Sequence, residues 1–210
     1  DLQEHFSGSG VLSLWSYRGD FKVLFPTDIR YGWDLRRKDH QTLLDEFHKQ
    51  VNVKIQFYAP ECTPWSIAST TAHPERKVQS RDRERPALQW IVDKCNSAEV
   101  KGNDYIVENP HSSQIWTASP LQELINKEHT YTNITDQCQH GLQDETGRLI
   151  QKRTDFVSNI KLKHTAIRCK CIKPHAWLVG HYNGINRTSR AKIYPERLCR
   201  SLIKNFGKQF

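Results

Sequence analysis

The stretch that decides the fold is VKIQFYAPECTPWS, residues 53–66. It begins with an apolar run typical of a buried strand and continues into a loop with a proline on each side of Cys62. Each proline fixes its own φ angle and biases the residue before it towards an extended conformation, so the loop is stiff. Such a loop holds one thiol in a fixed place, as a nucleophile requires. A structural cysteine is the alternative that this stretch alone leaves open.

Strand-like and helix-like segments alternate on both sides of this stretch. We expect strands over 2–6, 21–25, 51–58, 105–107, 131–135 and 156–160, helices over 11–17, 42–50, 87–96, 121–127 and 195–206, and a charged loop over 71–86. This alternation predicts an α/β protein with a mostly parallel sheet and helices on both faces. Ligands of such sheets bind beyond the carboxyl ends of the strands.

Two further motifs follow the first two expected strands. Residues 6–10 read FSGSG, between a strand and a helix. Glycines there allow close approach of a ligand to the backbone and expose amide groups at the start of the helix, although a simple tight turn is the alternative. Asp28 and Asp34 follow the second strand, where a carboxylate can accept hydrogen bonds from a ribose, or can serve as a turn or cap residue.

Glu108 lies at the end of the short apolar strand 105–107 and precedes Asn109-Pro110. Partial burial would favour its protonated form, which could donate a hydrogen bond to a ring nitrogen. A helix-capping or surface glutamate is the alternative. All these motifs follow strands, so we expect them to meet in one cleft.

Together these motifs resemble the carbon-5 cytosine DNA methyltransferases, above all the compact phage-type branch and similar domains of retroelements. Residues 6–10 match Phe-x-Gly-x-Gly, residues 60–66 match the nucleophile motif Pro-Pro-Cys-x-x-(Phe/Trp)-Ser, and residues 108–110 match Glu-Asn-Pro. The remaining matches are Arg81-Asp82-Arg83 with Leu88, Cys138-Gln139-His140-Gly141, Lys152-Arg153-Thr154 and Ser158-Asn159. The likeness covers nearly the whole chain in the correct order.

The resemblance implies a Rossmann-like, class I fold that uses S-adenosylmethionine, with a catalytic core over 1–160 and a short basic, nucleic-acid-contacting segment with a terminal helix over 161–210. It implies that Cys62 is the nucleophile, that Glu108 recognises the base, and that Arg153 assists. The implied cofactor-binding residues are Phe6, Gly8, Ser9, Gly10, Asp28, Asp34 and Pro60. The implied nucleic-acid contacts are Ser66, Arg83, Lys152, Arg187 and Arg190.

Three departures from the family pattern bear on activity. Glu61 replaces the second proline before the nucleophile, and a carboxylate beside a thiol raises the thiol pKa. Arg153 replaces the proline of Lys-Pro-Thr, which leaves the cytosine-contacting residue undetermined. About thirty residues separate Asn159 from Arg190, where larger members of the family insert a target-recognition domain. We therefore expect low sequence selectivity, or selectivity that a partner or further polypeptide supplies.

The charge distribution predicts a polyanion as partner. Residues 1–147 carry 16 Lys/Arg and 21 Asp/Glu, a net charge of −5, whereas residues 148–210 carry 15 and 2, a net charge of +13. A basic segment of this kind is typical of nucleic-acid binding. DNA is the expected substrate. RNA with the same site, or a degenerate non-catalytic binding module of a retroelement polyprotein, are the alternatives.

The composition also indicates the setting of the protein. No apolar stretch approaches the roughly 18 residues of a membrane span. We expect an intracellular protein, nuclear in a eukaryote and otherwise cytoplasmic. We also expect a monomer or a piece of a larger polyprotein, the latter because the sequence begins at Asp1 and contains no Met. The six cysteines do not indicate a disulfide framework. Cys169, Cys171, His175 and His181 could bind zinc, but their spacing matches no strong template, so we expect no metal.

Overall fold

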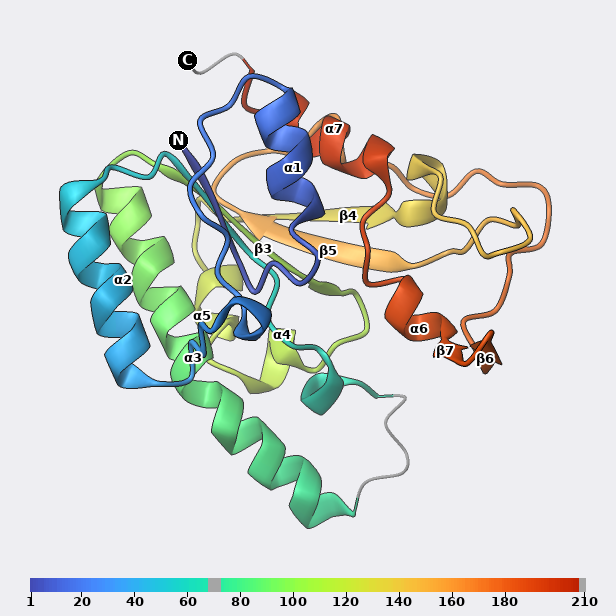
Figure 1. The fold of residues 1–210 in the computed structure, drawn as a ribbon, viewed down its shortest axis with the longest axis horizontal. Coiled ribbons are helices and arrows are strands. Elements are labelled where there is room, and N and C mark those ends of the chain that lie inside the picture. The colour runs from blue at the N-terminus through green and yellow to red at the C-terminus, as the bar shows by residue number, and fades with distance from the viewer. Residues whose placement is uncertain (68–72, 208–210) are drawn as a thin grey trace.

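The computed structural model describes residues 1–67 and 73–207. A mixed five-stranded sheet forms its centre, with strands in the order β1-β2-β3-β5-β4 (Figure 1). The strands are β1 (Leu2–His5), β2 (Ile55–Tyr58), β3 (Asp104–Pro110), β4 (Tyr131–Asp136) and β5 (Arg153–Ser158). The first three are parallel, and β5 runs antiparallel to both of its neighbours. The expected α/β class with a mostly parallel sheet is therefore confirmed.

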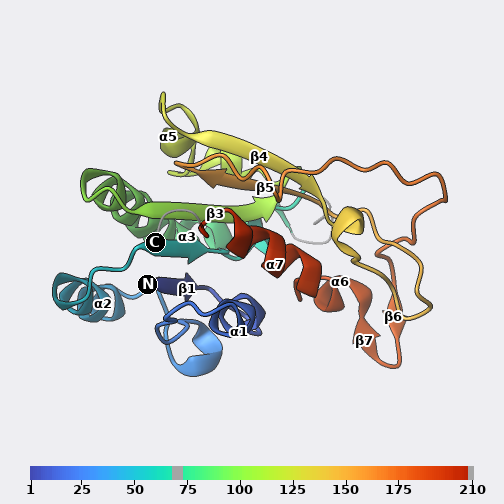
Figure 2. The same cartoon turned by 90° about the horizontal axis from the view of Figure 1, so that it is seen from above.

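Helices cover both faces of the sheet (Figure 2). One face packs against α2 (Lys38–Gln50), α3 (Pro74–Val100), α4 (Ile115–Ala118) and α5 (Gln122–Ile125). The other packs against α1 (Val11–Arg18) and α7 (Glu196–Lys204). Successive strand residues point to opposite faces, so Tyr58 lies in the first core and Phe57 in the second.

The strand order reverses between β1 and β2. Residues 21–25, expected as a full strand, make only an isolated parallel bridge from Val23 to Leu2, supported by a 2.9 Å hydrogen bond from the Leu24 amide to the Leu2 carbonyl. The chain thus passes first along the free edge of β1 and then crosses to β2 on its other side. In open α/β sheets, ligands bind at the carboxyl ends of the two strands where the order reverses.

The charged loop expected over 71–86 is wrong for its described part, because residues 74–86 form the first half of α3, with Pro86 inside the helix. Residues 71 and 72 lie outside the described residues. Charged side chains at helical spacing, such as Asp82 and Arg85 at 3.3 Å, support this exposed half. The Pro86 carbonyl accepts a 3.2 Å hydrogen bond from Gln41 of α2. Proline at both ends of the segment obscured this helix in the sequence.

Elsewhere the expected elements exist with shifted bounds. The strands expected over 51–58 and 156–160 are β2 and β5, which begin at Ile55 and Arg153, and the helix expected over 121–127 shrinks to α5. Short 3-10 helices complete the core at η1 (Ile29–Tyr31), η2 (Thr63–Trp65) and η3 (Gln137–His140).

A basic arm, which we define as residues 161–194, extends from the end of the sheet beside the 140–152 loop (Figure 1). It contains the two-stranded hairpin of β6 (His181–Tyr182) and β7 (Ile185–Asn186), followed by α6 (Arg187–Arg190). Leu162 and Tyr194 at its two ends pack in the second core. Between them, Ala176 and Ala191 pack with Leu142 and Ile150 in a small separate cluster. Among the residues that the structure describes, no helix is long and apolar enough to cross a membrane.

Candidate active site

A cavity of about 350 Å³ opens at the carboxyl ends of β1, β2 and β3, where the strand order reverses. This volume is within the range of small-molecule sites. Nine of the residues expected from the sequence line it: Phe6, Gly8, Ser9, Asp28, Asp34, Pro60, Cys62, Glu108 and Lys152. The structure thus brings the glycine turn, the cysteine loop and the glutamate into one site.

The loop that carries Cys62 is held from two directions. From β3, the Asn109 amide donates a buried 2.9 Å hydrogen bond to the Pro60 carbonyl. From α3, Arg81 donates a 3.0 Å hydrogen bond to the Pro64 carbonyl, and its guanidinium lies 5.1 Å from the ring centre of the fully buried Trp65. Prolines stiffen the loop and these contacts fix its position, so the half-buried Cys62 thiol is presented at the cavity.

The surroundings of Cys62 disfavour its thiolate. Burial raises the pKa of Cys62, and the charges of Glu61 and Glu108 raise it further, whereas Lys152 and Lys192 lower it. Glu61 accepts a 3.1 Å hydrogen bond from the Thr63 amide and lies 3.6 Å from the Lys192 ammonium. Burial opposes ionisation of Glu61, but these partners outweigh it and lower its pKa. The thiol therefore sits beside a charged carboxylate.

Glu108 is a buried carboxyl group at the wall of the cavity, 6% exposed. Burial raises its pKa, against the opposing effects of the Lys152 charge and a hydrogen bond with Tyr194. Lys152 Nζ lies 3.9 Å from Glu108 Oε1, beyond hydrogen-bond distance. This oxygen has no hydrogen-bond partner within the described residues. Protonated Glu108 can therefore donate a hydrogen bond to a ligand.

The glycine turn is fastened by Asp28. The Gly8 amide donates to Asp28 Oδ2 and the Arg30 amide to Oδ1, both at 2.9 Å. Gly8 has a φ of +54°, which glycine adopts readily, and a Cβ added there would meet no atom within 4 Å. The backbone at Gly8 is therefore open to close approach. Gly10 caps the start of α1 and is not among the lining residues.

Asp34 lines the cavity with its carboxylate already engaged. Arg36 binds it in a bidentate manner, Nε to Oδ1 at 2.7 Å and Nη2 to Oδ2 at 2.9 Å. The hydrogen bonds of Arg36 lower the pKa of Asp34. Arg36 also lies 3.4 Å from Glu84 of α3. The Asp34 carboxylate is thus fixed in its charged form.

Sequence reasoning missed several lining residues. Glu4 of β1 is buried, and burial raises its pKa to about 7 even though Ser13 donates two hydrogen bonds to its Oε2, at 2.9 and 2.6 Å. Trp33, Lys192 and Tyr194 also line the cavity. Its place near the carboxyl end of the first expected strand was the only signal for Glu4. Lys192 and Tyr194 reach the site from the far end of the chain, for which no local pattern exists.

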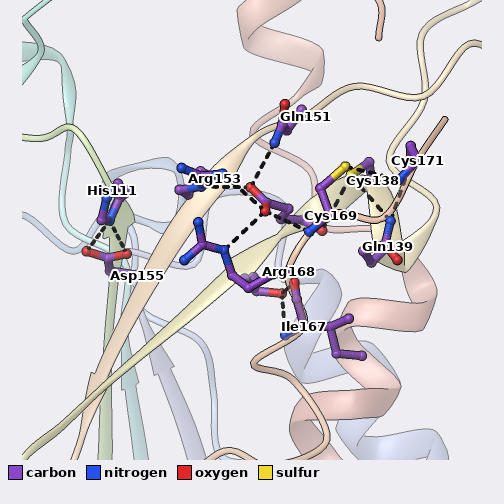
Figure 3. A network of polar contacts seen from close by, with 12 residues as sticks. His111, Cys138, Gln139, Gln151, Arg153, Asp155, Ile167, Arg168, Cys169 and Cys171 are labelled. Atoms are coloured by element: carbon purple, nitrogen blue, oxygen red, sulfur yellow. Dashed lines mark hydrogen bonds and ion pairs between the residues drawn. The ribbon is translucent and has the colours of Figure 1, made fainter. Parts of the chain in front are cut away.

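Arg153 lies apart from the other catalytic candidates, and its catalytic role remains a prediction. It does not line the cavity, and its Nε lies 2.9 Å from Oδ1 of the buried Asp136 (Figure 3). Neighbouring residues of an extended chain point in opposite directions. It is therefore Lys152, assigned from the sequence to nucleic-acid contact, that approaches Glu108.

The other expected nucleic-acid contacts lie outside the cavity. The Ser66 carbonyl accepts a 3.0 Å hydrogen bond from Lys77, and Arg83 is exposed on α3. Arg187 is paired with Glu145, and Arg190 lies 5.7 Å from the ring centre of Tyr182. None of these four residues is among those that line the cavity.

The four possible zinc ligands divide in the structure. Cys169, Cys171 and His175 lie together, with Cys138 as the fourth member of the group. His181 lies instead in β6, outside this group.

Comparison with known proteins gives no family assignment, since no family model and no curated protein matches the chain. Function must therefore be argued from the cavity itself.

Proposed function

We propose that the chain is a DNA cytosine carbon-5 methyltransferase of the Rossmann-like, class I fold that uses S-adenosylmethionine. The observation that carries the proposal is that Cys62 and Glu108 line the same cavity as the glycine turn, at the point where the strand order reverses. The fold part is supported by three parallel strands followed by the reversed β5 between β3 and β4.

In the proposed reaction, the Cys62 thiolate adds to carbon 6 of cytosine and forms a carbon–sulfur bond. Protonated Glu108 donates a hydrogen bond to ring nitrogen 3 through its unpartnered Oε1. This hydrogen bond stabilises the negative charge that develops on the ring as the electron pair of the attacked double bond moves to carbon 5, which thereby becomes nucleophilic. Carbon 5 takes up a methyl group and then loses its proton to a base. The electron pair of that bond restores the ring double bond and expels the Cys62 thiolate.

Lys152 takes the supporting role that the sequence gave to Arg153. Its ammonium lowers the pKa of Cys62 and so favours the thiolate needed for attack, whereas at Glu108 burial outweighs the Lys152 charge and the pKa of that carboxyl group stays raised. The base must leave the duplex stack to reach these groups.

The lining of the cavity fits S-adenosylmethionine, which supplies an electrophilic methyl group when bound. This cofactor carries a positively charged sulfonium, and the Glu4, Asp28 and Asp34 carboxylates lie around the cavity beside Phe6 and Trp33. Carboxylates favour a cationic ligand, and aromatic walls favour its flat base.

Glu61 favours a second candidate, a degenerate module that binds nucleic acid without catalysis. Its carboxylate raises the pKa of Cys62 and thereby lowers the thiolate fraction at neutral pH. An RNA substrate would use the same residues, because phosphate contacts are common to both nucleic acids.

A trapping experiment tests the proposal. An oligonucleotide with 5-fluorocytosine cannot lose a proton from carbon 5, so the covalent adduct should accumulate with S-adenosylmethionine present. Wild type should give a denaturation-resistant complex and Cys62→Ala none, whereas Cys95→Ala, which removes a buried thiol of α3 outside the cavity, should still react.

Matched DNA and RNA oligonucleotides identify the substrate in the same experiment. Adduct formation by Cys62→Ala would place the nucleophile elsewhere. Calorimetry with S-adenosylmethionine separates the two candidates: cofactor binding without any adduct supports the degenerate module, and no binding at high micromolar cofactor removes the basis of the methyltransferase proposal.

A further inference from the structure

Four side chains with metal-binding atoms gather where the arm meets the end of β4. They are Cys138 of η3 and Cys169, Cys171 and His175 of the arm, and their ligand atoms all lie within 4.8 Å of one another. Figure 3 shows the three cysteines converging from the two segments. Cys138 is buried, the other three are half-buried, and all three cysteines are free of disulfides.

The spacing fits tetrahedral zinc. Zinc–sulfur bonds of about 2.3 Å and zinc–nitrogen bonds of about 2.0–2.1 Å place a sulfur and a nitrogen ligand about 3.6 Å apart, and two sulfur ligands about 3.8 Å apart. Cys169 Sγ and His175 Nε2 are separated by 3.5 Å. Three cysteines and one histidine are also one of the standard sets for structural zinc.

Donors that suit thiolate ligands surround the group. The Cys171 amide lies 3.4 Å from Cys169 Sγ, and the Gln139 amide nitrogen lies 3.1 Å from Cys171 Sγ and 3.8 Å from Cys138 Sγ. The Cys169 backbone is fixed in turn, because its amide donates a 2.8 Å hydrogen bond to the buried Asp136 carboxylate. Such outer contacts orient metal ligands and stabilise their negative charge.

The arm has little apolar packing of its own to hold it against the rest of the protein. Leu162 and Tyr194 at its two ends pack in the second core, but between them its buried apolar residues are those of the small cluster around Ala176 and Ala191, while Ile172, Trp177 and Val179 are exposed. Small units with little apolar core are commonly stabilised by a metal.

We propose that Cys138, Cys169, Cys171 and His175 bind one structural zinc ion that fastens the arm to the end of β4. All four positions of a tetrahedral ion are filled by protein, which is the arrangement of a structural and not a catalytic site. The site differs from the set considered from the sequence, since Cys138 takes the place of His181. The proposal is independent of the methyltransferase proposal.

Metal analysis of the reduced, full chain tests this proposal. We expect one zinc per chain in wild type, and replacement by Co²⁺ should give the intense visible absorption of tetrahedral cobalt with thiolate ligands. Cys138→Ser and Cys169→Ser should lose at least tenfold in metal affinity. His181→Ala is the matched control and should retain full occupancy.

A fourth variant guards against simple misfolding. His175→Cys keeps four ligands and should retain the metal, but the added thiolate should strengthen the sulfur-to-cobalt absorption. An unchanged cobalt spectrum in this variant would remove His175 from the site. The proposal is overturned if wild type takes up no stoichiometric zinc at micromolar concentration, or if native mass spectrometry finds a disulfide among these cysteines in place of the metal.

Discussion

The pairing of Arg153 with Asp136 can be measured, and it decides whether Arg153 is a structural or a catalytic residue. Asp136 ends β4 with its side chain 1% exposed, and its carboxylate accepts hydrogen bonds from Arg153, Arg168 and the Cys169 amide. The two perturbations are Arg153→Met, which keeps the aliphatic stem, and Asp136→Asn, which keeps the shape and removes the charge.

The expected coupling free energy between Arg153 and Asp136 follows from how deeply the two side chains are buried. A hydrogen bond to a charged group stabilises a protein by about 1.5–3 kcal/mol when shielded from water. The Arg153 side chain is 38% exposed, so water replaces part of the interaction and the coupling should be about 1 kcal/mol. A double-mutant cycle on the free energy of unfolding in urea isolates this term.

The coupling should also depend on pH in one direction. Burial opposes ionisation of Asp136, but the hydrogen bonds from Arg153 and the Cys169 amide outweigh it and lower the pKa of Asp136. A lowered folded-state pKa stabilises the protein above the unfolded value of about 3.9, and this stabilisation is lost as the pH falls through the folded value. The coupling energy should be constant between about pH 5 and about pH 8. It should vanish at a pH below the folded-state pKa of Asp136, where the carboxyl group is protonated.

Trapping with 5-fluorocytosine supplies the functional readout. Per folded molecule, Arg153→Met should form adduct within about threefold of wild type, whereas Lys152→Met should lose about 10²-fold, within the range for removing a group that assists proton transfer. A folded Arg153→Met protein with a 10²-fold loss, or a coupling below about 0.3 kcal/mol, would refute the structural assignment.

Three further predictions concern the cavity and the arm. Glu61→Gln should lower the pKa of Cys62 by removing a neighbouring negative charge, so iodoacetamide should alkylate Cys62 several-fold faster at neutral pH; an unchanged pH profile would contradict this. Glu108→Gln should slow adduct formation about 10²–10⁴-fold while duplex binding stays unchanged, and a rate close to wild type would exclude Glu108 as the acid. Arg190→Ala should reduce the salt dependence of duplex binding by about 0.9 in the log–log slope, whereas Arg187→Ala should reduce it less because Glu145 neutralises Arg187; the reverse ranking would place the phosphates nearer Arg187.

The placement of Cys62 and the glycine turn could be predicted because it depends on local signals and one topological rule. Prolines and glycines set the two loops, and parallel strands bring the loops to one edge of the sheet. The direction in which Arg153 and Lys152 point could not be predicted, because a shift of one residue reverses the side chains of an extended segment. The first half of α3 was missed because Pro86 lacks an amide hydrogen and therefore indicates a helix end, although it lies inside the helix.

Contacts between distant segments could not be predicted from the sequence for a different reason. Cys138 lies 31 residues before Cys169, and no spacing rule joins them until β4 and the arm are placed in space. Tyr194 likewise hydrogen-bonds Glu108 from more than eighty residues along the chain. The motif that contains Cys138 gives no indication of Cys169, and Tyr194 belongs to no motif, so only the fold brings these residues to their partners.

These long-range contacts show that the expected catalytic core over 1–160 and the basic segment over 161–210 share one cavity. Lys192 lies 3.6 Å from Glu61, and Tyr194 hydrogen-bonds Glu108, so the end of the basic segment completes the cavity and bears on the charge of both reactive groups. Since Lys192 lowers the pKa of Cys62, any displacement of the arm's end would leave the thiol beside Glu61 without that opposing charge. A zinc ion bound at the proposed site would therefore affect the reactivity of the cysteine loop, through the chain between His175 and Tyr194.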